Sequence, residues 1–194
     1  MGIHVQTVNS HWSFFLALER DLEQLSRYIE FSQSNFSCFS LEIARVLLAA
    51  GAEVDVVCKQ LCQKLNPGSR AASIGTYCTE LVAAIPAISS WEVQVPRFGL
   101  LLHPWDEWKN PNGVPFWWTA YNKTKHHRHT DFKHANLKNA INAVAGLFVV
   151  ILYLYREQAE QALLLPAAQL FRPEPDHSGG ATFHEHEFGI NYVL

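Results

Sequence analysis

The stretch LKNAINAVAGLFVVILYLY, residues 137–155, has the most regular apolar pattern in the chain. Its apolar side chains recur every three or four residues, which is the spacing of one face of an α-helix. From Ala143 to Tyr155 the run is broken only by Gly146, and it is shorter than the ~20 residues that a helix needs to cross a bilayer. We therefore expect this stretch to form the central, most buried helix of a folded domain. The residues of the stripe are Leu137, Ile141, Val144, Phe148, Ile151 and Tyr155.

Length and composition fit a single packed domain with an appended tail. The chain has 194 residues, of which 48% are hydrophobic and 17% charged, and this balance excludes a disordered protein. A net charge of −3 excludes a protein that binds polyanions over its whole surface. Composition assigns no function, so any function has to come from a local site.

The cysteines and the N-terminal residues indicate the cellular compartment in which the protein is expected. No CxxC pair occurs, so neither a zinc ribbon nor a thioredoxin-type site is indicated. We interpret the cysteines as small apolar core residues in a reducing cytosol. Residues 1–12 lack the basic and apolar regions of a signal peptide, so a cytoplasmic protein with no membrane partner is expected. The cysteines are Cys38, Cys58, Cys62 and Cys78.

Four further helices are predicted before residue 137. The first follows Ser10 as N-cap, with Glu19, Arg20, Glu23 and Arg27 on a solvated face. The second begins after Ser40 and ends at 66–68, the third covers about 70–84, and the fourth has Pro115 in its first turn. Thr130 or Asp131 is the expected N-cap of the fifth.

These elements predict an all-α, up-and-down bundle of about five helices. An irregular connection rich in Pro and Trp, residues 86–113, precedes the fourth helix and includes a short strand near 93–95. An irregular C-terminal tail follows the fifth. The helical domain is expected over residues 1–165, and the tail, residues 166–194, either extends from it or packs on it.

Basic residues and histidines are concentrated in one segment. Residues 123–138 contain five of the fifteen Lys and Arg, four of the ten His and a single acid, Asp131. The segment thus carries +4 within a chain whose net charge is −3. Such a distribution indicates a local anion site.

One face of the fourth helix has the residue types that phosphodiester chemistry needs. Asn122, Lys125, His126 and His129 follow the spacing i, i+3, i+4, i+7 and share a face. Lysine and arginine would neutralise the phosphate, and a histidine would transfer protons near neutral pH. Since RNA carries its own nucleophile in the 2′-hydroxyl, no metal is required. The alternative is an ordinary solvated polar helix face.

The segment WWTAYNKTKHHRHTDFKHANLKNAINAVAGL, residues 117–147, resembles the last two helices of a HEPN (higher eukaryotes and prokaryotes nucleotide-binding) domain. Many HEPN proteins are metal-independent ribonucleases of toxin–antitoxin, CRISPR and phage-defence systems. Their motif, an Arg followed after four to six residues by His, fits Arg128 and His134, with His129 in the polar position. A second register, YNKTKHHR, resembles uncharacterised HEPN-like proteins and would use Asn122, Lys125, His126 and Arg128.

The resemblance implies roles for individual residues, and the two registers leave open which histidine acts. Catalytic roles fall to His126, Arg128 and His134, and substrate binding to Asn122, Lys125, His129 and Lys133. Asp55 or Glu42 of the second helix, together with Tyr121, would support the site, although an ordinary i,i+4 pair between Asp55 and Lys59 is the alternative. No cofactor is implied. The implied partners are a second copy of the chain, RNA, and a cognate antitoxin or defence subunit.

Other features give weaker signals. His184, Glu185 and His186 alternate as in a strand but lack a third metal ligand, and His126, His129 and His134 lack an HExxH arrangement for zinc. Tryptophans near the prolines could stack bases, although filling the core is the more frequent role.

The sequence thus predicts a metal-independent ribonuclease or RNA-binding effector. The alternatives are a non-catalytic helical interaction protein, whose polar cluster is structural, and a nucleotide-binding module.

Overall fold

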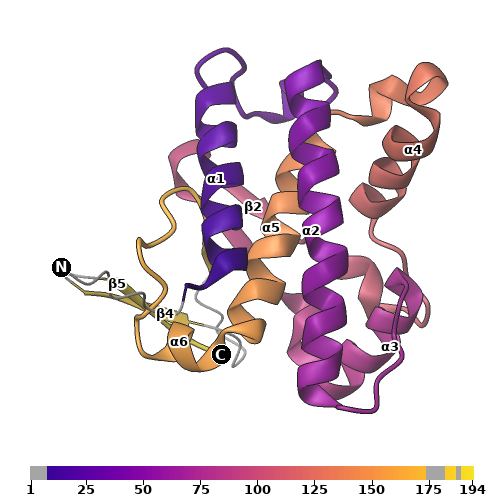
Figure 1. The fold of residues 1–194 in the computed structure, drawn as a ribbon. Coiled ribbons are helices and arrows are strands. Elements are labelled where there is room, and N and C mark those ends of the chain that lie inside the picture. Colours follow the sequence, from indigo (N-terminus) through magenta and orange to yellow (C-terminus); the bar gives the residue numbers. More distant parts are fainter. Residues whose placement is uncertain (1–7, 174–181, 187–188) are drawn as a thin grey trace, which may run out of the picture.

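The computed structural model describes residues 8–173, 182–186 and 189–194, and it is predominantly helical (Figure 1). The helices are α1 (Ser10–Leu25), α2 (Leu41–Leu65), α3 (Ile74–Ala84), α4 (Phe116–Asp131), α5 (Leu137–Leu154) and the short α6 (Arg156–Glu160). The strands are β1 (Val93–Val95), β2 (Leu100–Leu102), β3 (Arg172–Pro173), β4 (Thr182–His186) and β5 (Gly189–Val193). The predicted all-α bundle is confirmed, with small strands added at its edge.

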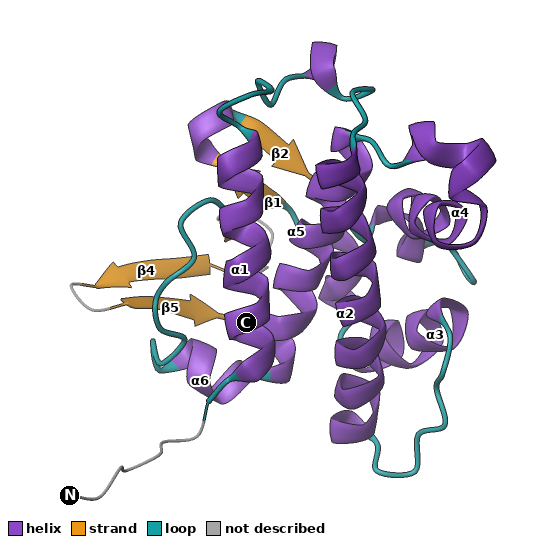
Figure 2. Ribbon diagram, turned by 45° about the horizontal axis from the view of Figure 1, so that its top comes forward, coloured by secondary structure: helices purple, strands orange, loops and turns teal. Residues whose placement is uncertain are grey.

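Helix α5 forms the centre of the bundle, as its sequence predicts. It lies behind α2 and between α1 and α4, and its most extensive contacts are with α2 (Figures 1 and 2). Every residue from Asn139 to Leu154 is buried. The helix is long and apolar enough to span a membrane, yet 94% of it is buried inside this fold. Burial on all sides explains why the apolar pattern covers the whole circumference of its second half.

The helix starts follow local capping chemistry. The Ser40 hydroxyl accepts from the backbone N–H of Ile43, and Ser73 forms a capping box with Thr76. Two predicted caps are wrong. Asn9, not Ser10, precedes α1, and Asn136 caps α5 by accepting from the N–H of Asn139. Because α4 and a 3-10 turn continue to residue 134, neither Thr130 nor Asp131 is available as that cap.

The Pro/Trp-rich connection contains the predicted strand at residues 93–95, and that strand belongs to a small antiparallel sheet. The order is β2-β1-β3, so the third strand comes from the C-terminal tail. The tryptophans fill the core. The Trp105 ring lies 4.1 Å from that of Trp108 and 5.2 Å from that of Trp117, and a Cβ at Gly146 would come within 3.0 Å of Trp117. Since these rings are buried, the alternative that they stack bases is wrong.

The C-terminal tail is more ordered than the sequence predicts. Strands β4 and β5 form an antiparallel pair, and Asn191 on β5 donates to the backbone oxygen of Glu160 at 2.7 Å. Phe171 and Tyr192 are fully buried against the helices. The described part of the tail therefore packs on the helical domain, and the prediction of a wholly irregular tail is wrong.

One buried carboxylate fastens the tail to α1. Glu19, expected on a solvated face, is only 3% exposed and accepts hydrogen bonds from the backbone N–H groups of Gln169, Leu170 and Phe171 at 2.7 to 3.2 Å. Burial raises the pKa of Glu19, and the three N–H donors partly offset that rise. The solvated-face prediction is wrong at this position because the partner segment lies 150 residues away in the chain.

Candidate functional site: a cationic groove between α2 and α4

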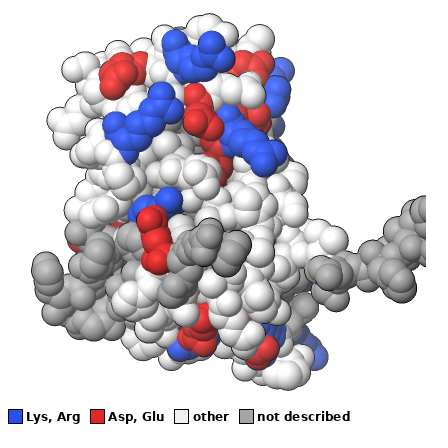
Figure 3. All heavy atoms as spheres, turned by 90° about the vertical axis from the view of Figure 1, so that its left-hand side faces the viewer, with Lys and Arg blue, Asp and Glu red and all other residues white. Residues whose placement is uncertain are grey.

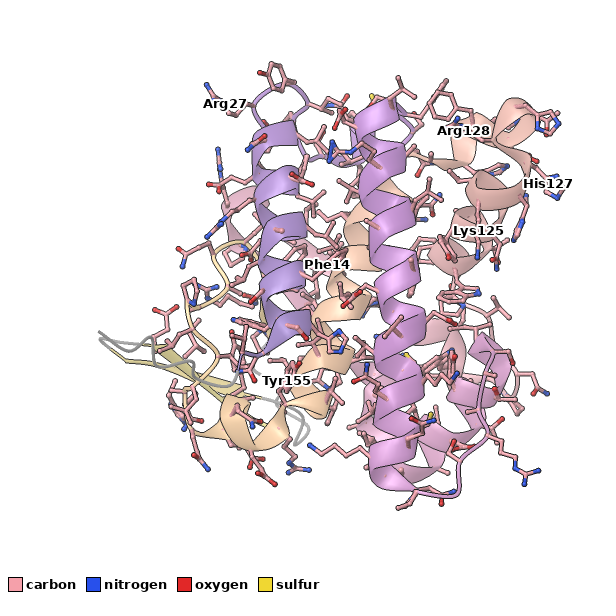
Figure 4. The ribbon with its side chains drawn as sticks, viewed as in Figure 1. Phe14, Arg27, Lys125, His127, Arg128 and Tyr155 are labelled. Carbon is pink, nitrogen blue, oxygen red and sulfur yellow. The ribbon has the colours of Figure 1, made fainter. Side chains whose placement is uncertain are left out.

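The C-terminal half of α4 and the N-terminal half of α2 enclose an open groove of about 660 Å³. The α4 side carries the basic and histidine side chains, whereas the α2 side is apolar. Figure 4 shows Arg128 on α4 near the end of α2, and His127 pointing away from the bundle. The lining residues are Leu41, Leu48, Thr124, Lys125, His126, Arg128, His129 and Phe132.

A glycine lets α4 approach α2 closely enough to form this groove. A Cβ at Gly51, on α2, would lie 2.4 Å from the Tyr121 ring, so that ring occupies the space which a side chain would need. Tyr121 is itself buried, and the Lys125 ammonium lies 5.5 Å from its ring centroid. Tyr121, predicted to support the site, therefore lies where it can do so by packing.

A break in α4 lies within the candidate site. His127 has non-helical backbone angles (φ −133°, ψ 31°), is exposed and does not line the groove. Lys125 and His126 before the break, and Arg128 and His129 after it, all line the groove. In the part of the chain that the structure describes, no carboxylate forms an ion pair with Lys125 or Arg128. Their charges are thus available to an anionic ligand.

Other predicted residues lie outside the groove. The Nε2 atom of His134 lies 3.4 Å from Lys123 Nζ and 3.5 Å from Asp131 Oδ1. Neither His134, Lys133 nor Asn122 lines the groove. The structure thus brings Lys125, His126 and Arg128 together, whereas it does not place Arg128 and His134 in the same groove.

The acids predicted to support the site have other contacts. Asp55 accepts a hydrogen bond from the Tyr77 hydroxyl at 3.2 Å, and Glu42 pairs with Arg45 at 3.0 Å. Neither lines the groove. The alternative Asp55–Lys59 pair is also absent from the ion pairs of the described residues.

The apolar wall of the groove could not be predicted from the sequence. Leu41 and Leu48 belong to the apolar stripe of α2, yet Leu41 is 65% exposed and both face the groove. Thr124 is only 1% exposed, and its hydroxyl has no hydrogen-bond partner among the described residues. No local pattern pairs residues 41–48 with 124–132, because they are about 80 positions apart.

The residues do not assemble a metal centre in the described part of the chain. No group of three or more His, Cys, Asp and Glu side chains is placed there to hold a metal ion. His126 and His129 share the groove, but His134 lies apart from them, so the three histidines do not form the zinc set considered from sequence. The side chain of His186 lies outside the described residues.

Charge is distributed differently elsewhere on the molecule. Figure 3 shows acidic and basic side chains interspersed on the face that lies at the left of Figure 1. Ion pairs between different elements also occur outside the groove, including Arg97 with Glu23 at 3.7 Å and Arg45 with Asp21 at 3.4 Å. The groove differs from these places because its cations, Lys125 and Arg128, lack such acidic partners within the described residues.

Fold and groove together define a predominantly helical bundle with a cationic groove that has an apolar wall. Comparisons with protein-family models, curated proteins and solved structures find no match to this chain. The resemblance to HEPN domains therefore stays a prediction from the sequence, made on the helical plan of residues 10–160 and on the motif residues within 120–147.

Proposed function

We propose that the groove between α2 and α4 binds the backbone of RNA and that the protein is a metal-independent ribonuclease of a defence or toxin system. The observation that carries the proposal is that Lys125, His126, Arg128 and His129 line one groove. Cleavage next to a 2′-hydroxyl needs an imidazole that transfers a proton and a cation that stabilises the charge developing on phosphorus, and this groove holds two of each.

The chemistry follows from these four side chains. Lys125 and Arg128 bind the phosphate and stabilise the charge that develops on its oxygens. The neutral imidazole of His126 removes the proton of the 2′-hydroxyl, whose oxygen attacks the adjacent phosphorus. The bond from phosphorus to the 5′ oxygen breaks, and the imidazolium of His129 protonates that oxygen. The products are a 2′,3′-cyclic phosphate and a 5′-hydroxyl end. His129 takes the acid role in this account because His134 lies outside the groove.

The opposite wall suits a nucleobase. Leu41, Leu48 and Phe132 offer an apolar surface across from the cations, and stacking of a base on an aromatic ring contributes about 1–3 kcal/mol. A nucleotide thus matches both sides of the groove.

Incubation of the purified protein with total RNA in EDTA tests this function. We expect fragments with 2′,3′-cyclic phosphate ends, which T4 polynucleotide kinase converts to ligatable 3′-hydroxyl ends only through its phosphatase activity. The rate is expected to fall steeply as salt is raised, since phosphate contacts release counterions. The proposal would be contradicted if the RNA stayed intact with the protein purified alone and also with the protein co-expressed with the products of its neighbouring genes.

A non-catalytic interaction protein is the second candidate, and one observation favours it. Leu41 and Phe39 are large apolar side chains that are exposed at or near the groove. A protein partner could cover them, in keeping with the second copy or cognate subunit that the HEPN resemblance implies. In that case Leu41→Lys abolishes partner binding, whereas substitution of His126 or Arg128 changes stability and no activity.

A further inference from the structure

A second groove, of about 440 Å³, lies beside the small sheet and shares no lining residue with the first. All of β2 lines it, together with the start of α4 and the first turns of α5. Its lining includes Glu107, Phe116, Lys138 and Asn142.

Strand β2 has a free edge. The sheet order is β2-β1-β3, so β1 pairs with one side of β2, and no strand pairs with its other side within the described residues. Leu101, at the middle of β2, is 46% exposed. Such an edge presents backbone N–H and C=O groups that an extended peptide can pair with.

Two acceptors in this groove lack a complete set of partners. Asn142 is only 5% exposed on the otherwise apolar α5, and its amide nitrogen donates to the Lys138 carbonyl at 2.9 Å, which leaves its side-chain oxygen available. The Oε2 atom of Glu107 is buried and has no hydrogen-bond partner in the described part of the chain. Because a buried acceptor left unpaired costs about 1–3 kcal/mol, a ligand that donates to it gains that energy.

The charges also favour a cationic ligand. Asp106 already pairs with Lys109, whereas Glu107 has no ion pair within 4 Å among the described residues. The Lys138 ammonium lies 4.8 Å from the centroid of the Phe116 ring, which shows that this ring face can hold a cation at the edge of the groove. Burial raises the pKa of Glu107, and the backbone N–H groups of Glu107 and Phe116 oppose that rise. The neighbouring Asp106 carboxylate also raises this pKa and the Lys138 ammonium lowers it, so a further cation placed beside Glu107 would stabilise its charged form.

We propose that this groove binds an extended peptide segment of a partner protein, which adds as a strand to the free edge of β2 and donates from a lysine or arginine side chain to Glu107 and Asn142. Main-chain pairing supplies the affinity, and the Glu107 carboxylate, together with the Asn142 amide oxygen, selects the basic side chain. The proposal concerns a different groove from the RNA site and does not depend on ribonuclease activity.

Peptide titration tests the proposal directly. The probe is acetyl-Val-Val-Arg-Val-Val-amide, added to protein labelled with ¹³C at leucine methyl groups. We expect the methyl signals of Leu101 and Leu102 to shift and those of Leu41 and Leu48 to stay. Replacing the peptide's arginine by norleucine should weaken binding at least about tenfold. Two further peptides carry N-methyl groups on alternate backbone nitrogens, one set in each register, and methylation of the nitrogens that pair with β2 should abolish binding.

Variants of the protein complete the test. Glu107→Gln should weaken the binding of the arginine peptide at least about tenfold and leave the weaker binding of the norleucine peptide unchanged. Glu92→Gln is the matched control, since Glu92 is exposed, pairs with His103 at 3.5 Å and does not line the groove. Equal binding of the arginine and norleucine peptides to the wild-type protein would overturn the charge selection even if Glu107→Gln failed to fold. If both N-methylated peptides bound as tightly as the unmethylated arginine peptide, the strand addition would be overturned.

Discussion

Replacing Arg128 by alanine is expected to lower the rate of RNA cleavage by at least about 100-fold, with little change in the free energy of unfolding. Arg128 is exposed and forms no ion pair within the described residues, so its removal leaves no buried group without a partner. It would, however, remove a charge aimed at the phosphate. Initial rates on a fluorogenic RNA in EDTA, together with urea denaturation, measure both quantities.

Matched histidine variants give this prediction its control. His127→Ala should leave the rate within about twofold of the wild-type rate, because His127 points away from the groove. His126→Ala and His129→Ala should each lower it by about 10²- to 10⁴-fold, the range for loss of a general base or acid. If His134→Ala is the most damaging of the four, the Arg128–His134 register is the correct one and the groove assignment is wrong.

Replacing Glu19 by alanine is expected to lower the free energy of unfolding by about 3–4 kcal/mol. Three backbone N–H groups of the tail, those of Gln169, Leu170 and Phe171, would lose their acceptor, and two of these residues are buried. Glu19→Gln keeps one acceptor oxygen and should cost less. Glu23→Ala is the control, since Glu23 is exposed on the same helix and should change stability by no more than about 0.5 kcal/mol.

The pH dependence has a definite sign for Glu19. Its pKa is raised above 4.5 in the folded protein, so the folded state binds this proton more tightly than the unfolded state does. The resulting contribution to stability is fully present below pH 4.5 and is lost as the pH rises through the folded pKa. Comparing urea denaturation of the wild type and Glu19→Gln across that range isolates the contribution, and a contribution that grew with pH would contradict this sign.

Much of the fold could be predicted because its signals are local. The apolar pattern of residues 137–155 predicts α5, and Ser40 predicts the start of α2, since periodicity and capping depend on residues within one or two turns. The cap of α5 was predicted at Thr130 or Asp131 because either side chain can cap a helix and the local pattern does not show where α4 ends. The structure shows that α4 and a 3-10 turn continue through both positions and that Asn136 is the cap.

The candidate site could be predicted only in its α4 half. Lys125, His126, Arg128 and His129 are adjacent in sequence, and their composition alone indicates an anion site. The apolar wall formed by Leu41 and Leu48, and the burial of Glu19, depend on segments distant in the chain. A one-dimensional pattern contains no information about which helix faces which, so those contacts required the structure.

The central claim is that the imidazoles beside residue 128 contact an RNA backbone. Titration of a non-cleavable 2′-deoxy or 2′-O-methyl oligonucleotide into ¹⁵N-histidine-labelled protein tests it, with the imidazole nitrogen signals assigned by single substitutions. We predict that the signals of His126 and His129 shift in a saturable manner and lose the shift in Arg128→Ala, whereas the signals of His11 and His103 stay unchanged. Saturable shifts confined to histidines outside the groove, or no shifts at low salt, would contradict the account.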